Sequence, residues 1–148
     1  YPEKLIPKAI ILAHRNEKIP IYGNGKSIRD WIFVDDHCNA IMKVLHKGKK
    51  GESYNISASN EIDVLTIIKQ ILSIMNKDIS NYELSEDRPG HDFRYSLDSS
   101  KIRKELNWNP KVSFEEGIKT TVEWYLKNQE WWKDITDIKT LNSIQWKS

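Results

Sequence analysis

The chain has 148 residues, of which 39% are hydrophobic and 30% charged, a composition that fits one folded α/β or α+β domain and excludes a disordered tail. Its formal net charge is only +2, and the basic and acidic residues are interleaved, which argues against a nucleic-acid-binding protein. One cysteine and the lack of any apolar run near the ~20 residues of a membrane span lead us to expect a cytoplasmic protein without membrane contact.

The first third of the sequence predicts two helices separated by two short strands. Residues 3–17 carry apolar side chains every three or four positions, which is typical of an amphipathic helix. Residues 19–34 indicate a strand, a Gly-Asn-Gly turn and a second strand. Residues 35–48 predict a helix that Asp35 caps and that ends near Gly48.

Helices and strands continue to alternate through the rest of the chain. The predicted elements are a strand at 52–57, a helix at 62–76, a strand at 82–84, a helix at 99–106 begun by Asp98, and a helix at 113–132. Ser113 and Glu116 have the spacing of a capping box at the start of the last helix. We therefore predict a mixed, helix-rich α/β domain over residues 1–135 and a loose tail over residues 136–148. Because the chain opens inside a helical pattern, we expect it to be part of a longer protein.

No dinucleotide-binding turn is visible in this sequence. Such a turn needs glycines between a strand and a helix, whereas Gly23-Asn24-Gly25 is expected to join two strands. Tyr22 and Lys26 have the spacing of a dehydrogenase Tyr-Lys pair, but the intervening glycines break the helix that such a pair requires.

The histidine, cysteine and tryptophan residues suggest packing rather than chemistry. The four histidines lack metal-ligand spacing, so we expect no metal site. Cys38 is expected to be a small buried group. Trp124, Trp131 and Trp132 are expected to pack in the core.

Arg29 is the first candidate ligand-binding residue, because it interrupts an apolar strand. On that strand it would share a face with Trp31 and Phe33. A guanidinium in such surroundings needs a partner, which could be a structural carboxylate such as Asp30 or Asp35, or a phosphate group of a ligand.

The segment "SEDRPGHDFRY" provides the second candidate. Its Pro-Gly turn can present Arg88 and His91 on the same side. Two arginines on separate elements, with no metal site, favour a diphosphate ligand over two independent structural ion pairs.

Five segments together resemble a known family. They are "YPEKLIPKAI", "IPIYGNGKSIRDWIFVDDHCNAI", "GESYNI", "DRPGHDFRYSLDSSKIRKELNWNP" and "SFEEGIKTTVEWYLKNQEWW". Over about residues 1–135 they resemble the C-terminal half of the dTDP-glucose 4,6-dehydratases, within the extended short-chain dehydrogenase/reductase superfamily.

The resemblance implies a set of substrate-binding positions. Residues 4–9 would line the nucleotide, and residues 20–22 would form part of the pocket for its base and ribose. Arg29 and Arg88 would bind the diphosphate, and residues 87–91 would form a loop that closes over the nucleotide. The positions are Lys4, Leu5, Ile6, Pro7, Lys8, Ala9, Pro20, Ile21, Tyr22, Arg29, Asp87, Arg88, Pro89, Gly90 and His91. Val64 stands where the family often has an asparagine that contacts the substrate, which leaves the choice between thymine and uracil open.

The resemblance also implies what this chain lacks. The family's NAD-binding and catalytic residues belong to an N-terminal Rossmann half, so we expect no catalytic or cofactor-binding residue here and no activity from this chain alone. The complete enzyme would be a homodimer that binds NAD and converts a nucleotide-diphosphate glucose to its 4-keto-6-deoxy product. Two alternatives stay open: the same part of a UDP-sugar epimerase or decarboxylase, and a stand-alone binding module.

Overall fold

The computed structural model describes residues 2–87, 89–136 and 141. The chain divides into two compact units. Unit 1 comprises residues 1–26, 63–91 and 119–148, and unit 2 comprises residues 27–62 and 92–118. Within the part of the chain that is described, no helix has both the length and the apolar character to cross a membrane.

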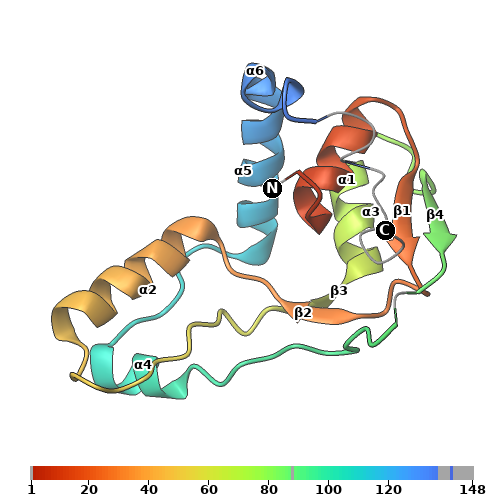
Figure 1. The fold of residues 1–148 in the computed structure, drawn as a ribbon. Helices are drawn as coiled ribbons and strands as arrows, with labels where there is room; N and C mark the ends of the chain where they lie inside the picture. Colours follow the sequence, from red (N-terminus) through yellow and green to blue (C-terminus); the bar gives the residue numbers. More distant parts are fainter. Residues whose placement is uncertain (1, 88, 137–140, 142–148) are drawn as a thin grey trace. The chain divides into compact units, whose positions relative to one another are not determined.

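Unit 1 is built on two parallel strands with two helices beside them (Figure 1). The strands are β1 (Ile19–Tyr22) and β4 (Tyr82–Ser85), and their register pairs residue 19 with residue 82. The helices are α1 (Leu5–His14) and α3 (Val64–Ile74), which pack against each other and against β1.

The core of unit 1 is aliphatic. Its fully buried side chains on these elements are Ala9, Ile10, Ile11, Leu12, Ala13, Ile19, Ile21, Ile67, Ile68, Ile71 and Leu72. Asp63 begins α3 by accepting a hydrogen bond from the backbone amide of Thr66, at 2.9 Å. An apolar stripe and a capping carboxylate therefore account for α3, the helix that the sequence predicts most clearly.

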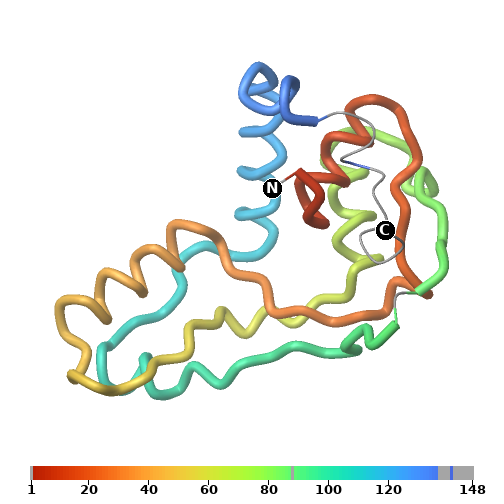
Figure 2. The backbone as a smooth tube through the Cα atoms, in the orientation of Figure 1, coloured from red at the N-terminus to blue at the C-terminus, as the bar shows by residue number. Residues whose placement is uncertain are grey.

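Unit 2 is organised around extended segments. Strand β2 (Ile28–Asp30) pairs with β3 (Glu61–Asp63), while Ile28 also exchanges hydrogen bonds with residues 93 and 95. Figure 2 shows the chain near residues 30, 60 and 95 running side by side. The helices of this unit are α2 (Val34–Lys47) and α4 (Ser100–Leu106), and its core contains Ala40, Ile102, Leu106 and Trp108.

Two more helices follow. Helix α5 (Phe114–Lys127) spans the division between the units, and α6 (Gln129–Lys133) follows Asn128. The hydroxyl of Ser113 accepts a hydrogen bond from the amide of Glu116, as the capping-box prediction requires. The single predicted helix at 113–132 is thus two helices.

Several sequence-based expectations are confirmed and others are wrong. The helices at 3–17 and 62–76 and the strand at 82–84 are present, with shorter helix bounds than expected. Residues 52–57, predicted as a strand, have no regular secondary structure, and no strand pairs with them among the described residues. The two strands predicted on either side of the Gly-Asn-Gly turn are present, and they pair with β4 and β3 respectively.

Capping and burial bring further corrections. Helix α2 begins after Phe33, and the carboxylate of Asp36 rather than Asp35 is buried, where it accepts backbone hydrogen bonds from residues 111 and 112. Gly48 ends this helix as predicted.

The expected burial is wrong for three side chains. Cys38 is exposed, and so are Trp124 and Trp131, which stack edge to face on each other, whereas Trp132 is buried as expected. Of the predicted tail, only Thr136 and Leu141 are described, and both are buried.

Candidate functional site

Unit 1 contains a cavity of about 400 Å³ beside its two strands. It is lined by Lys8, Glu17, Lys18, Pro20, Tyr22, Glu83 and Ser85. The strand register explains this lining, since residue 20 lies beside residue 83 and residue 22 beside residue 85. Because side chains alternate along a strand, residues 19 and 21 point into the core while residues 20 and 22 face the cavity.

Lys8 brings a positive charge from α1 to this cavity. Its side chain is half-buried, and burial lowers the pKa of its ammonium group. Among the described residues the ammonium makes no hydrogen bond or ion pair, although Glu17 and Glu83 line the same cavity. A desolvated cation in this position is suited to contact a polar or anionic group of a ligand.

The structure brings together some of the predicted nucleotide-binding residues. Lys8, Pro20 and Tyr22 line the cavity, while Ala9 and Ile21 are buried in the core and could offer a ligand only backbone atoms. The other predicted residues of this region differ in exposure: Lys4 is exposed and pairs with Glu3, and Leu5, Ile6 and Pro7 are half-buried.

The predicted closing loop follows β4. Asp87 and His91 contact each other through Oδ1 and Nδ1 at 2.7 Å, and Pro89 and Gly90 between them are exposed. Gly23, in the turn after β1, has a φ of +60°, a left-handed conformation that favours glycine, and a Cβ there would also lie 2.8 Å from Asp87 Oδ2. Arg88 lies outside the described residues, and its pairing with Arg29 across a diphosphate stays a prediction.

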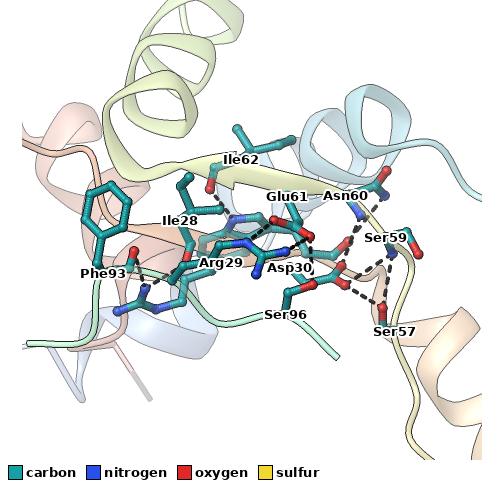
Figure 3. Close-up of polar contacts among 12 residues, drawn as sticks. Ile28, Arg29, Asp30, Ser57, Ser59, Asn60, Glu61, Ile62, Phe93 and Ser96 are labelled. Carbon is teal, nitrogen blue, oxygen red and sulfur yellow. Dashed lines mark hydrogen bonds and ion pairs between the residues drawn. The ribbon is translucent and has the colours of Figure 1, made fainter. Parts of the chain in front are cut away.

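Arg29, in unit 2, is held by backbone carbonyls, among them those of Ile28 and Phe93 (Figure 3), and by the ring of Tyr95. Its Nη1 donates to the carbonyl of Ile28 at 2.6 Å and its Nη2 to the carbonyl of Asp92 at 2.9 Å. The centre of the guanidinium lies 4.4 Å from the centroid of the Tyr95 ring, a cation–π contact.

No carboxylate neutralises Arg29 among the residues that the structure describes. Asp30 instead accepts hydrogen bonds from Ser57, Ser59 and Asn60, and Asp35 is exposed. The predicted alternative of an ion pair with Asp30 or Asp35 is therefore wrong. Nε of Arg29 donates to none of the described residues, which leaves one edge of the guanidinium able to bind an oxyanion.

A hollow of about 360 Å³ adjoins Arg29 within unit 2. Its lining combines the Arg29 and Tyr95 side chains with polar and aliphatic residues: Asp30, Ile32, Ile56, Ser57, Ser96 and Leu97. Tyr95 is a site residue that the sequence reasoning missed. The available signal was its place in an extended Arg-Tyr-Ser run, where residues 94 and 96 face the opposite side from residue 95.

In the described parts of the chain, no three His, Cys, Asp or Glu side chains cluster so as to hold a metal ion. The turn at residues 23–25 leads from β1 toward β2 rather than into a helix, so it does not fit the pyrophosphate of a dinucleotide.

The chain resembles known proteins over most of its length. The family model described as GDP-mannose 4,6 dehydratase matches residues 1–121. A dTDP-glucose 4,6-dehydratase of Escherichia coli is 47% identical over an alignment that covers 93% of this chain and 41% of that protein.

Two solved structures extend the comparison to the fold. The dTDP-glucose 4,6-dehydratase of Bacillus anthracis in complex with NAD has a TM-score of 0.88 and 46% identity, over 92% of this chain and 43% of that one. A dTDP-glucose 4,6-dehydratase of Streptomyces venezuelae with NAD and TYD bound has a TM-score of 0.89 and 40% identity, over 92% and 42%. The chain thus spans about two fifths of the length of these relatives.

Proposed function

The chain belongs to the family described as GDP-mannose 4,6 dehydratase, and from this we propose that it is the nucleotide-sugar-binding portion of a dTDP-glucose 4,6-dehydratase. The observation that carries the proposal is the cavity of unit 1, where Lys8, Pro20 and Tyr22 lie together. All three are positions that the family resemblance assigns to the nucleotide. Pro20 and Tyr22 share one face of β1, and Lys8 joins them from α1, which supports a base and ribose site there.

Arg29 would bind the diphosphate. Its Nε, which donates to none of the described residues, and its cation–π contact with Tyr95 leave a planar, preoriented donor group, which suits a phosphate oxygen. The loop of residues 87–91 would cover the nucleotide, with His91 held by Asp87. The role of this chain would be to fix the glucose relative to the reacting groups of the rest of the enzyme.

The chemistry is proposed for a longer protein. That protein would be a lyase that removes water from the glucose unit and yields the 4-keto-6-deoxy sugar nucleotide, and this chain alone would be inactive. NAD is proposed for it because two relatives were solved with NAD. The residues described here do not fit a dinucleotide, so the NAD site is assigned to sequence outside these 148 residues.

Exposed apolar side chains on α2 indicate that this helix of unit 2 contacts another part of the complete protein. Val34 and Leu45 are 62% and 73% exposed, and Cys38, Ile41 and Met42 are exposed at intermediate helical positions on the same helix. A stripe of this kind is unusual on a surface that faces only water. We assign it to contact with the cofactor-binding part of the complete protein, whose further partner would be a second copy in a homodimer.

A thermal-shift series tests the nucleotide site. We expect dTDP, at about 100 times its Kd, to stabilise the protein made from the complete reading frame by about 2.7 kcal/mol, with UDP and GDP giving smaller shifts. Equal shifts with all three nucleotides would leave a diphosphate site without base selection. No shift with any of them would refute the proposal.

Arg29→Ala tests the diphosphate contact. Loss of a charge-assisted hydrogen bond should weaken dTDP binding at least about tenfold, measured by isothermal titration calorimetry. Lys119→Ala is the matched control, because it removes the same charge from an exposed site on α5. An unchanged Kd for the Arg29 variant would refute its role.

A further inference from the structure

The orientation of Arg29 depends on a neighbouring segment with little regular structure of its own. The carbonyl of Asp92 and the ring of Tyr95, which contact the guanidinium, both belong to residues 92–96. This segment is exposed and forms only an isolated bridge to Ile28. Whatever fixes residues 92–96 therefore also fixes Arg29.

Glu61 holds this segment from the other side. Its carboxylate accepts two hydrogen bonds from Arg94, from Nε at 2.6 Å and from Nη2 at 2.6 Å, and a third from the hydroxyl of Ser96 at 2.7 Å. Side chains alternate along an extended chain, so a carboxylate that binds residues 94 and 96 leaves residue 95 on the opposite side. That is the side on which Tyr95 meets Arg29.

Glu61 is itself anchored through its backbone neighbours (Figure 3). Asp30, next to Arg29 on β2, accepts hydrogen bonds from the hydroxyl of Ser57 and from the amides of Ser59 and Asn60. The side chain of Asn60 donates to the carbonyl of Trp31 at 3.3 Å. The loop that precedes Glu61 is thus tied to the strand that carries Arg29.

We propose that Glu61 and Arg94 are a positioning pair that sets the Arg29 guanidinium for a phosphate-bearing ligand, without touching that ligand. The inference rests on the proposed function. The two parallel hydrogen bonds between Arg94 and Glu61 fix the orientation of residues 92–96, which a single contact would not do. Ser96 adds a second point of attachment to the same carboxylate.

The Glu61–Arg94 pair is expected to contribute little to the stability of the fold. The side chains of Arg94 and Glu61 are 55% and 33% exposed, and ion pairs this open to water contribute little to folding stability. The pair does connect two segments far apart in the sequence, and one of them, residues 92–96, carries the Asp92 carbonyl and the Tyr95 ring that contact Arg29. Its loss should therefore affect Arg29 more than it affects the fold.

The test uses calorimetry with dTDP on the protein made from the complete reading frame. We expect Glu61→Gln and Arg94→Gln each to weaken binding about three- to tenfold, and the double variant to be no weaker than either single one, as a coupled pair requires. The matched control is Glu52→Gln, which removes another exposed ion pair of unit 2, with Lys101 at 2.7 Å. It should leave the dTDP affinity unchanged.

The Arg29→Ala background separates positioning from a general structural effect. If Glu61 acts through Arg29, Glu61→Gln should change dTDP affinity less than about twofold once Arg29 is absent. If Glu61→Gln weakens dTDP binding as much in that background as in the unmodified protein, the inference is overturned. It is also overturned if the losses of Glu61→Gln and Arg94→Gln add up in the double variant, or if either single variant binds dTDP as tightly as Glu52→Gln does. If the unmodified protein fails to bind dTDP, the proposed function fails and the inference with it.

Discussion

The two units differ in how they hold their candidate ligand-binding residues. In unit 1 most of the cavity residues lie on β1, β4 and α1, which are regular elements packed on an aliphatic core, and Glu17 and Lys18 lie in the connection between α1 and β1. In unit 2, Arg29 lies on a strand of only three residues, and its surroundings are fixed by polar contacts of loop residues. Apolar packing is cooperative and insensitive to single contacts at the surface, whereas a polar network depends on each of its members.

The difference has a consequence for function. A site on packed strands keeps its shape without a ligand, so unit 1 should present a preformed pocket for a base and ribose. Arg29 is oriented by a short set of hydrogen bonds, so unit 2 can lose its ligand contact through a change several residues away. Variants of each unit should therefore differ in the balance between stability and binding.

The largest expected effect is on the core of unit 1. Ile71→Ala truncates a fully buried side chain of α3 and should lower the free energy of unfolding by about 2–5 kcal/mol, through lost burial and a cavity. Urea denaturation followed by tryptophan fluorescence measures this. Ile79→Ala, which truncates a side chain of unit 1 that is 56% exposed, is the control and should change stability little. Equal losses for the two variants would contradict the core assignment.

The next effect is on a buried polar contact in unit 2. Asp36→Ala leaves the amides of Lys111 and Val112 without their acceptor and should lower the free energy of unfolding by about 1–3 kcal/mol. Asp36→Asn keeps an oxygen in the same place and should lose less than half as much. Hydrogen exchange read by mass spectrometry should show the protection falling in residues 27–62 and 92–118.

The sequence predicts elements whose causes are local. Helix α3 follows from an apolar stripe and a capping aspartate, and α5 from the Ser113–Glu116 capping box. Residues 52–57 alternate like a strand and Tyr54 and Ile56 do pack on the core of unit 2, yet a strand also needs a partner, which local pattern cannot supply. Local pattern thus predicts burial there but not pairing.

The candidate site divides in the same way. The resemblance places Lys8, Pro20 and Tyr22 near a nucleotide, and the structure brings them into one cavity. Glu83 and Ser85 join them through the register of a parallel pair, which connects residues more than 60 positions apart and cannot be read from either strand alone.

Distance along the chain also explains the missed partners. The sequence suggested Asp30 and Asp35 for Arg29 because they are near in sequence, whereas its contacts, apart from that with the carbonyl of Ile28, come from residues 92–95. Asp36 was missed in favour of Asp35 for a similar reason, since the amides that it meets belong to residues 111 and 112. In both cases the tertiary partner decides which neighbouring side chain is used.

A smaller effect is expected at the start of α3, where unit 1 depends on a polar contact. Asp63→Ala removes the cap and should lower the free energy of unfolding by about 1 kcal/mol. Burial raises the pKa of Asp63, but hydrogen bonds from the hydroxyl and amide of Thr66 outweigh it and leave the pKa below its ordinary value.

The pH dependence of this cap follows from the lowered pKa. The stabilising contribution is present above the pKa of the unfolded chain and is lost as the pH falls through the lower pKa of the folded protein. Asp63→Asn keeps an acceptor for the cap but cannot titrate, so the stability difference between the two proteins should shrink on acidification. A difference that grows as the pH falls would contradict the assigned sign.

The smallest change in stability is expected for an exposed ion pair of unit 2. Glu52→Gln breaks the ion pair with Lys101, whose ammonium keeps its hydrogen bond to the carbonyl of Ser53 at 2.9 Å. Both charged groups are open to water, where screening acts over about 8 Å at physiological salt, so we expect no measurable shift in the urea midpoint. If Glu52→Gln lowers the stability as much as Asp36→Ala does, exposed ion pairs stabilise unit 2 as strongly as the buried carboxylate of Asp36. That result would contradict the expected difference between buried and exposed polar contacts.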